Sequence, residues 1–177
     1  NLHGFEWMVG PYSVAQLRFT RALTSYGVSI PLLGPGIYLS NTLESPHTNP
    51  PAPPLFHKPI AQEHERSLAI KDRETVLVCL GNPPYGRHEA ITKDNRATTG
   101  GWVRHGEELE PHGRPILEDF LEPARKAGHG VDLKNLYNHY VYFIRWSLWK
   151  VFEHKTATGP GILSFITASS YIDGDAF

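Results

Sequence analysis

Residues 76–85 read VLVCLGNPPY, a continuous apolar run that passes directly into a turn with two adjacent prolines. Such a run predicts a central strand of a parallel sheet that is covered on both faces. Pro83 and Pro84 each fix φ and remove an N–H donor, so few conformations are open to the turn. Asn82 offers an amide oxygen there, and Tyr85 offers a flat aromatic face. A planar amine could donate hydrogen bonds to Asn82 and to a proline carbonyl while its ring stacks on Tyr85.

Strands and helices are expected to alternate around this stretch. Apolar runs predict strands over residues 2–6, 37–40, 76–80 and 162–167. Helical periodicity predicts the main helices over residues 13–26, 60–70 and 134–153. In the first helix, Ser13 is the expected cap and Gly27 the expected stop. This alternation predicts an α/β fold in which helices flank a parallel sheet with right-handed crossovers.

Polar residues stand at or just past the carboxyl ends of three predicted strands, where ligands of parallel sheets collect. They are Glu6, Asn41 and Asn82. A carboxylate such as that of Glu6 can accept both hydroxyls of a ribose, and the amide of Asn41 can donate to and accept from an adenine edge. The residues alone are equally compatible with an exposed strand-end glutamate and an asparagine in a turn.

The tetrapeptide Asn82-Pro83-Pro84-Tyr85 resembles motif IV, (D/N/S)-P-P-(Y/F/W), of the S-adenosylmethionine-dependent amino-methyltransferases. Three flanking segments extend the resemblance to the large adenine-N6 DNA methyltransferases. They are residues 2–15, similar to the motif II region, residues 36–44, similar to motif III, and residues 161–171, similar to the strand after motif IV. Together the segments resemble the methyltransferase core of type ISP restriction–modification enzymes, which also carry a DNA-translocating motor and a target-recognition domain.

This resemblance implies a partial Rossmann-like methyltransferase fold that transfers a methyl group to the N6 amine of adenine in DNA. The catalytic motif would be Asn82, Pro83, Pro84 and Tyr85. Asn82 would accept hydrogen bonds from the amine, and Tyr85 would hold an adenine flipped out of double-stranded DNA. Positioning the amine against an already activated methyl group requires neither a metal ion nor a covalent intermediate.

The same resemblance assigns the cofactor, S-adenosylmethionine, to residues near the first two predicted strands. Glu6 would bind its ribose, Trp7 would lie against its adenine ring, and Asn41 would contact the adenine edge. A tryptophan packed in the core is the alternative interpretation of Trp7. Many relatives carry an aspartate at the position of Asn41.

The family's glycine-rich motif I is not found in the sequence and would precede Asn1. We therefore expect residues 1–177 to be an internal segment of a methyltransferase domain. Residues 87–130 are expected to be an insertion of loops with one short helix near residues 116–126. The missing first strand would belong between the strands that end at Glu6 and Leu80. The remaining domains of a parent restriction–modification enzyme are the expected partners, and the segment alone should be inactive.

Two other functions remain open. The same tetrapeptide would serve a methyltransferase that acts on protein glutamine or on RNA bases. The chain could also be an inactive fragment that retains only the scaffold of the fold.

Composition limits the partners further. The net charge is −1, which argues against a surface that grips duplex DNA by itself. The sequence contains no run of eighteen apolar residues, so no membrane span is expected, and the N-terminus lacks the pattern of a signal peptide. Cys79 is the only cysteine, so a cytoplasmic location is expected. The histidines are scattered, and the cluster around His64 is expected on a solvated face, so no metal site is predicted.

Overall fold

The computed structural model describes residues 1–31, 34–47, 58–86, 95–107, 113–131, 133–167 and 169, with only the backbone of Pro59. The chain divides into two compact units. The first comprises Asn1–Thr42 and Pro46–Asp72, and the second comprises Leu43–Ser45 and Arg73–Phe177. Each unit carries one small parallel sheet together with helices. The structure therefore belongs to the mixed α/β class, as the alternating pattern predicts.

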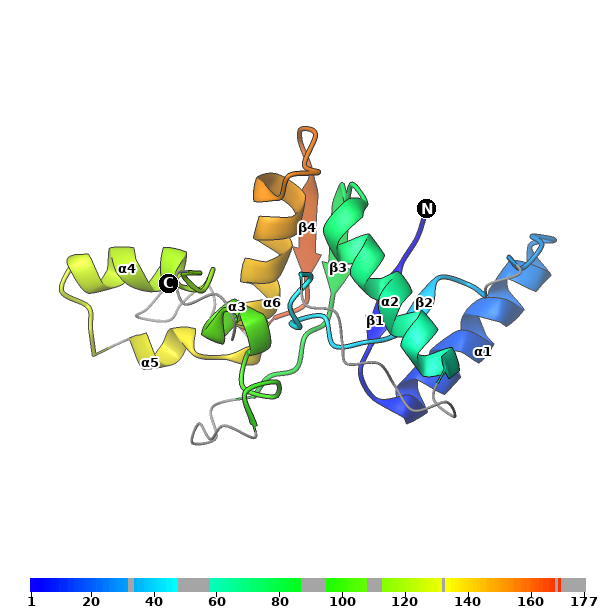
Figure 1. Ribbon diagram of the computed structural model, residues 1–177, viewed down its shortest axis with the longest axis horizontal. Coiled ribbons are helices and arrows are strands. Elements are labelled where there is room, and N and C mark those ends of the chain that lie inside the picture. Colours follow the sequence, from blue (N-terminus) through cyan, green and yellow to red (C-terminus); the bar gives the residue numbers. More distant parts are fainter. Residues whose placement is uncertain are drawn as a thin grey trace. The chain divides into compact units, whose positions relative to one another are not determined.

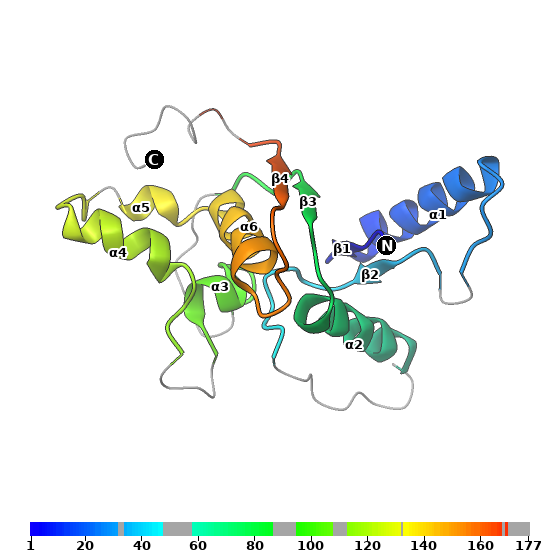
Figure 2. The same cartoon turned by 90° about the horizontal axis from the view of Figure 1, so that it is seen from above.

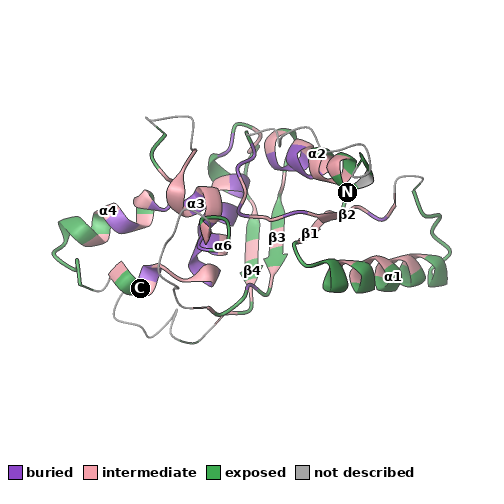
Figure 3. Cartoon of the chain, turned by 60° about the horizontal axis from the view of Figure 1, so that its bottom comes forward, coloured by how far each residue is buried: buried purple, intermediate pink, exposed green. Residues whose placement is uncertain are grey.

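In the first unit, β1 (Gly4–Glu6) pairs in parallel with β2 (Ile37–Leu39), and Glu6 lies opposite Leu39. The helix α1 (Val9–Ser25) connects the two strands, and α2 (Lys58–Arg73) follows them (Figure 1). One side of α1 is half-buried and the other is exposed, and no residue of this helix is fully buried (Figure 3). Because β1 and β2 run in the same direction, their carboxyl ends lie at one edge of this sheet.

The helix α1 begins four residues before the predicted cap. Its N-cap is Met8, and the hydroxyl of Ser13 instead donates a hydrogen bond to the Val9 carbonyl, at 2.9 Å. Pro11 is tolerated because the N–H groups of a first turn have no intrahelical acceptor. The predicted stop at Gly27 is confirmed. Gly27 has φ +69° and donates to Thr24, and Val28 donates to Leu23, which is the Schellman pattern.

In the second unit, β3 (Val78–Gly81) pairs in parallel with β4 (Ile162–Phe165), and Gly81 lies opposite Phe165. The helix α6 (His139–Leu148) packs on one face of this pair (Figures 1 and 2). On the other face Leu80 is 72% exposed and Ile162 is 60% exposed. The expectation of a strand covered on both faces is therefore wrong for the described residues, because helices cover a single face of this short sheet.

The helices of the second unit are α3 (Gly101–His105), α4 (Glu118–Lys126), α5 (Leu133–Leu136) and α6, which continues into a π-helical turn, η3 (Trp149–Glu153). The short helix predicted near residues 116–126 is confirmed as α4. Two results differ from expectation. The segment 87–130 also contains α3, and the helix predicted over 134–153 is interrupted at Asn138, which has an extended backbone with φ −130° and ψ 148°.

The core of the second unit surrounds α6. Its most deeply buried apolar side chains come from α3, α4, α6, η3 and the residue before α4, and include Val103, Leu117, Leu121, Val141 and Val151. Much of α6 is buried around its whole circumference rather than along one stripe (Figure 3). In the described part of the chain, no helix has the length and apolar character needed to cross a membrane.

Candidate functional site

The turn with two prolines leaves β3 directly at its carboxyl end. Pro83 is buried and anchors the turn, whereas Asn82, Pro84 and Tyr85 are exposed. The carbonyl of Gly81 accepts a hydrogen bond from the N–H of Ile166, at 3.0 Å, so the turn begins where the pairing with β4 ends. The amide and the aromatic ring are thus presented together at the strand end, as the sequence predicts.

Tyr85 contacts Asn82 within this turn. The Tyr85 hydroxyl lies 3.2 Å from Oδ1 of Asn82 and 3.1 Å from the carbonyl oxygen of Ile166. Both partners are acceptors, so the single hydroxyl hydrogen is shared between them. The contact orients the amide oxygen of Asn82 toward the tyrosine side chain, and the Tyr85 side chain remains 54% exposed. An acceptor and a stacking face are therefore accessible side by side.

Gly81 is required by close packing beneath the turn. A Cβ atom at this position would lie 2.6 Å from Cε1 of Phe165, far inside van der Waals contact. The Phe165 ring of β4 therefore packs directly on the backbone that carries Asn82. This contact supports the turn from the sheet side and gives a physical reason for the glycine that precedes the motif.

Of the residues predicted to bind the cofactor, Glu6 and Trp7 lie at the carboxyl end of β1 in the first unit. Oε1 of Glu6 accepts a hydrogen bond from the N–H of Met8, at 2.8 Å, which holds the carboxylate beside the start of α1. Trp7 is 51% exposed, so it is not the core tryptophan that was the alternative interpretation. Both side chains are placed where a ligand could reach them.

Asn41 follows β2 by two residues, and a buried lysine fixes its backbone. Nζ of Lys71, from α2, donates to the carbonyl oxygen of Asn41 at 2.5 Å and to Oγ of Ser40 at 2.9 Å. The same ammonium lies 5.2 Å from the centre of the Phe5 ring in β1. Lys71 is fully buried, and Oγ of Ser67 also donates to Ser40, at 2.8 Å. The sequence interpretation missed this lysine.

Glu63 is a second residue whose role the sequence did not reveal. Its Oε2 accepts a hydrogen bond from the Leu39 N–H of β2, at 3.2 Å, and its Oε1 accepts one from the Tyr12 hydroxyl. Burial, followed by the bond to Glu63, raises the pKa of Tyr12 to about 12. Glu63 therefore supports β2 rather than lying on a solvated face. The sequence did carry a signal for this role: Glu63, Ser67 and Lys71 are spaced at i, i+4 and i+8, which places them on one side of α2.

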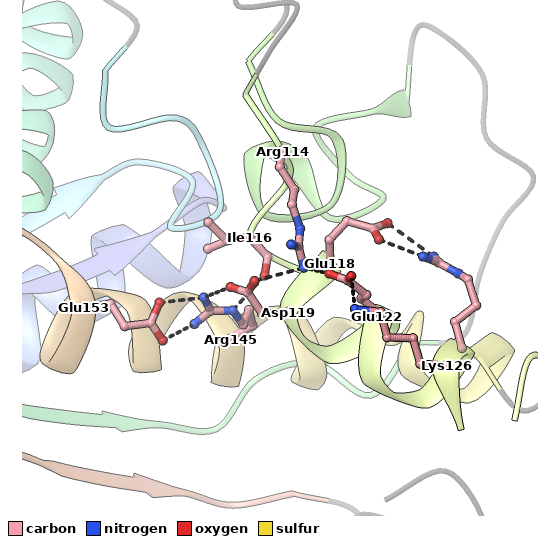
Figure 4. Close-up of polar contacts among 9 residues, drawn as sticks. Arg114, Ile116, Glu118, Asp119, Glu122, Lys126, Arg145 and Glu153 are labelled. Carbon is pink, nitrogen blue, oxygen red and sulfur yellow. Dashed lines mark hydrogen bonds and ion pairs between the residues drawn. The ribbon is translucent and has the colours of Figure 1, made fainter. Parts of the chain in front are cut away.

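The main charged cluster of the second unit is structural. Arg145 of α6 is 2% exposed and donates to both carboxylate oxygens of Glu153 at 2.8 and 2.6 Å, to Asp119 of α4 at 2.5 Å and to the Ile116 carbonyl at 2.8 Å (Figure 4). Arg114 and Lys126 add ion pairs to Glu122 at the surface of α4 (Figure 4). The bonds of Arg145 tie α4 and the residues before it to α6 and η3.

Two further polar groups of the second unit are Cys79 in β3 and Lys150 in η3. Burial raises the pKa of the Cys79 thiol, against the opposing influence of Ser147 and of the Lys150 charge, so the thiol is kept neutral. Nζ of Lys150 lies 3.3 Å from Nδ1 of His154 and 3.3 Å from Oγ1 of Thr156, and these contacts tie the end of η3 together.

Within the residues that the structure describes, no group of three or more His, Cys, Asp or Glu residues could hold a metal ion.

No family model, no curated protein and no solved structure matches this chain. The residues predicted to bind a cofactor belong to the first unit, and those predicted to bind a target amine belong to the second.

Proposed function

We propose that this chain transfers a methyl group from S-adenosylmethionine to the N6 amine of adenine in DNA, as part of a restriction–modification enzyme. One observation carries the proposal. The Asn82–Tyr85 turn presents an amide oxygen and a half-exposed aromatic ring together at the carboxyl end of a parallel strand. This is the pair of groups that an adenine taken out of the base stack needs for hydrogen bonding and stacking.

The sheet topology supports the same proposal. In the Rossmann-like fold that the sequence resembles, one strand separates the two pairs that correspond to β1–β2 and β3–β4. The two parallel pairs observed here form two separate sheets, and neither pair is hydrogen-bonded to the other. This is what the strand order of that fold requires when the strand between the pairs is not part of the chain. Polar residues follow the strands of both pairs, at the edges where ligands of such sheets bind.

The cofactor fits the polar and aromatic side chains at the end of β1 and after β2. The Glu6 carboxylate would accept hydrogen bonds from the ribose hydroxyls, and the exposed Trp7 ring would cover the adenine. Asn41, held through its carbonyl by Lys71, would contact the adenine edge. S-adenosylmethionine, when bound, supplies an electrophilic methyl group, whose bond to sulfur breaks as the bond to the target nitrogen forms.

Asn82 would act on the target amine. Its Oδ1 accepts a hydrogen bond from the N6 amine, which orients the nitrogen lone pair and favours the positive charge that develops on nitrogen. The excess proton then passes to solvent. The Tyr85 ring would hold the base in place through its face. Because the net charge is −1, other parts of the enzyme would hold the DNA duplex.

The test uses the intact protein that carries this sequence, incubated with S-adenosylmethionine labelled on its methyl group. Double-stranded DNA, RNA and a glutamine-containing protein are offered separately, and the labelled product is digested and identified. We expect label in N6-methyladenine from DNA. Label in RNA or in glutamine would identify the alternative methyltransferases, and absence of label from all three substrates would leave only the inactive scaffold.

A further inference from the structure

His139 lies next to the candidate catalytic turn although it is 54 residues distant from Tyr85 in sequence. It is the first residue of α6. Its Nε2 lies 2.7 Å from the carbonyl oxygen of Thr98, and its Nδ1 lies 3.3 Å from that of Gly86, the residue that follows Tyr85. The backbone N–H of His139 also points to the Gly86 carbonyl, at 3.4 Å.

Carbonyl oxygens only accept hydrogen bonds, so a ring nitrogen must carry a proton to bond either of them. A neutral imidazole has one N–H, and the shorter distance assigns it to Nε2, which donates to Thr98. The backbone N–H of His139 then serves Gly86. One residue thereby joins the end of the Asn82–Tyr85 turn to the segment 95–107.

Packing at Gly86 is a second, independent observation. A Cβ atom on residue 86 would lie 2.7 Å from Nδ1 and 3.3 Å from Cε1 of His139. The imidazole therefore rests directly on the backbone of the turn, and only glycine leaves room for it. Movement of this ring toward the turn would therefore displace the residue that follows Tyr85.

The neighbours of the imidazole on both sides have further contacts of their own. Its ring meets that of Tyr142 edge to face, with centres 6.0 Å apart, and Tyr142 is fully buried in α6. On the other side, the Thr98 N–H and hydroxyl both donate to the Asn95 carbonyl, at 3.1 and 2.8 Å. Groups supported by a buried helix and by further hydrogen bonds hold their geometry well.

We propose that His139 is a positioning residue for the target base. By fixing the turn at Gly86, it sets the angle at which Tyr85 and Asn82 meet the adenine ring and its amine. This inference rests on the proposed function, because it gives the turn a substrate. A displacement of the reacting group by about 1 Å can lower a rate about 10²-fold.

The experiment compares His139→Leu and His139→Gln in the intact protein, with His129→Leu as a control at an exposed histidine of the same unit. For each variant we would measure kcat for adenine methylation, the Kd for S-adenosylmethionine and the melting temperature. The fluorescence of 2-aminopurine at the target position reports whether that base is stacked or unstacked. We expect His139→Leu to lower kcat by about 10–10²-fold and to alter the fluorescence, with cofactor affinity unchanged. The glutamine amide can still donate to Thr98, so His139→Gln should recover part of the rate.

A second variant approaches the same contact from the other side. Gly86→Ala pushes on the imidazole and should reproduce the fall in kcat and the altered fluorescence, so it carries the test if His139→Leu does not fold. Wild-type kcat and fluorescence in these variants would overturn the inference. So would a parallel fall in melting temperature, cofactor affinity and kcat, which indicates only a structural role. A wild-type protein that methylates no adenine refutes the proposed function itself.

Discussion

The hydroxyl of Tyr85 contacts Oδ1 of Asn82, the acceptor that the proposed chemistry assigns to the target amine. Oδ1 of Asn82 is 3.2 Å from this hydroxyl, which has a second acceptor in the carbonyl of Ile166, at 3.1 Å. Because the shared hydroxyl hydrogen has a second acceptor, an incoming amine can donate to Oδ1 of Asn82 while the Tyr85 hydroxyl donates to Ile166 alone. The Tyr85 hydroxyl and Oδ1 of Asn82 then both keep a hydrogen-bond partner when the base binds.

Asn82→Ala is expected to lower the rate of adenine methylation by about 10²–10³-fold, the typical effect of removing one positioned polar group at a reacting centre. Cofactor affinity should stay nearly unchanged, because Glu6, Trp7 and Asn41 belong to the other unit. Single-turnover kinetics and a cofactor titration measure the two effects. Asn135→Ala, in α5, is the matched control. Wild-type turnover in Asn82→Ala would refute the role of this amide.

Tyr85→Phe should be tolerated much better than Tyr85→Ala. The phenyl ring preserves stacking on the base, which is worth roughly 1–3 kcal/mol, whereas alanine removes it. The phenylalanine variant loses only the exposed hydrogen bonds to Asn82 and Ile166. Values of kcat/KM on the same DNA substrate compare the variants. Equal losses of kcat/KM in both variants would mean that the hydroxyl is essential and that stacking does not explain the role of Tyr85.

At the scale of elements, the π-helical turn η3 gives α6 its connection to α4. Glu153 follows Arg145 by eight residues, which in a regular α-helix places it about 80° round from Arg145. The wider π turn rotates Glu153 back toward the guanidinium. Arg145 can then hold both oxygens of Glu153 together with Asp119 of α4 (Figure 4).

Arg145→Leu is therefore expected to lower the free energy of unfolding by about 1.5–3 kcal/mol, the range for hydrogen bonds to charged groups. The carboxylates left behind are half exposed, so their charges remain partly solvated and the loss stays below that of a wholly buried pair. Denaturant unfolding monitored by tryptophan fluorescence measures the change. Arg125→Leu removes an exposed partner of Glu118 and should change stability little. Equal effects of the two variants would show that burial of Arg145 adds nothing.

At the scale of the whole molecule, the candidate residues are divided between two units, each with its own parallel sheet. In the first unit, Lys71 joins α2, β1 and the residues after β2. In the second, His139 and Phe165 support the turn after β3. The division implies that variants of one unit should affect cofactor binding, and variants of the other should affect the target base.

Lys71→Met tests this division. Methionine keeps an unbranched apolar chain that is one atom shorter and removes the bonds to Ser40 and Asn41, each worth about 1.5–3 kcal/mol when the donor is charged. We expect a rise of tenfold or more in the Kd for S-adenosylmethionine, since about 1.4 kcal/mol is tenfold in affinity. The 2-aminopurine signal of bound DNA should not change. Lys134→Met, at an exposed lysine of α5, is the control. An altered base signal with intact cofactor affinity would contradict the assignment of Lys71 to the cofactor side.

The sequence by itself determined the features that depend on neighbours along the chain. The apolar runs located all four described strands, Gly27 located the end of α1, and the motif after Leu80 located the exposed turn. These signals arise from the φ preferences of glycine and proline and from local hydrophobic periodicity, which act over a few residues. For the same reason, the positions of Glu6, Asn41 and Asn82 at strand ends could be predicted from the sequence alone.

Tertiary structure alone decided which polar side chains support those positions. Lys71 reaches Asn41 across 30 residues, Glu63 reaches Leu39 across 24, and His139 reaches Gly86 across 53. It also decided that Trp7 is exposed, that Leu80 faces outward and that Asn138 interrupts the long predicted helix. Burial and hydrogen bonding between segments remote in sequence depend on how the elements pack, and local periodicity carries no information about those partners.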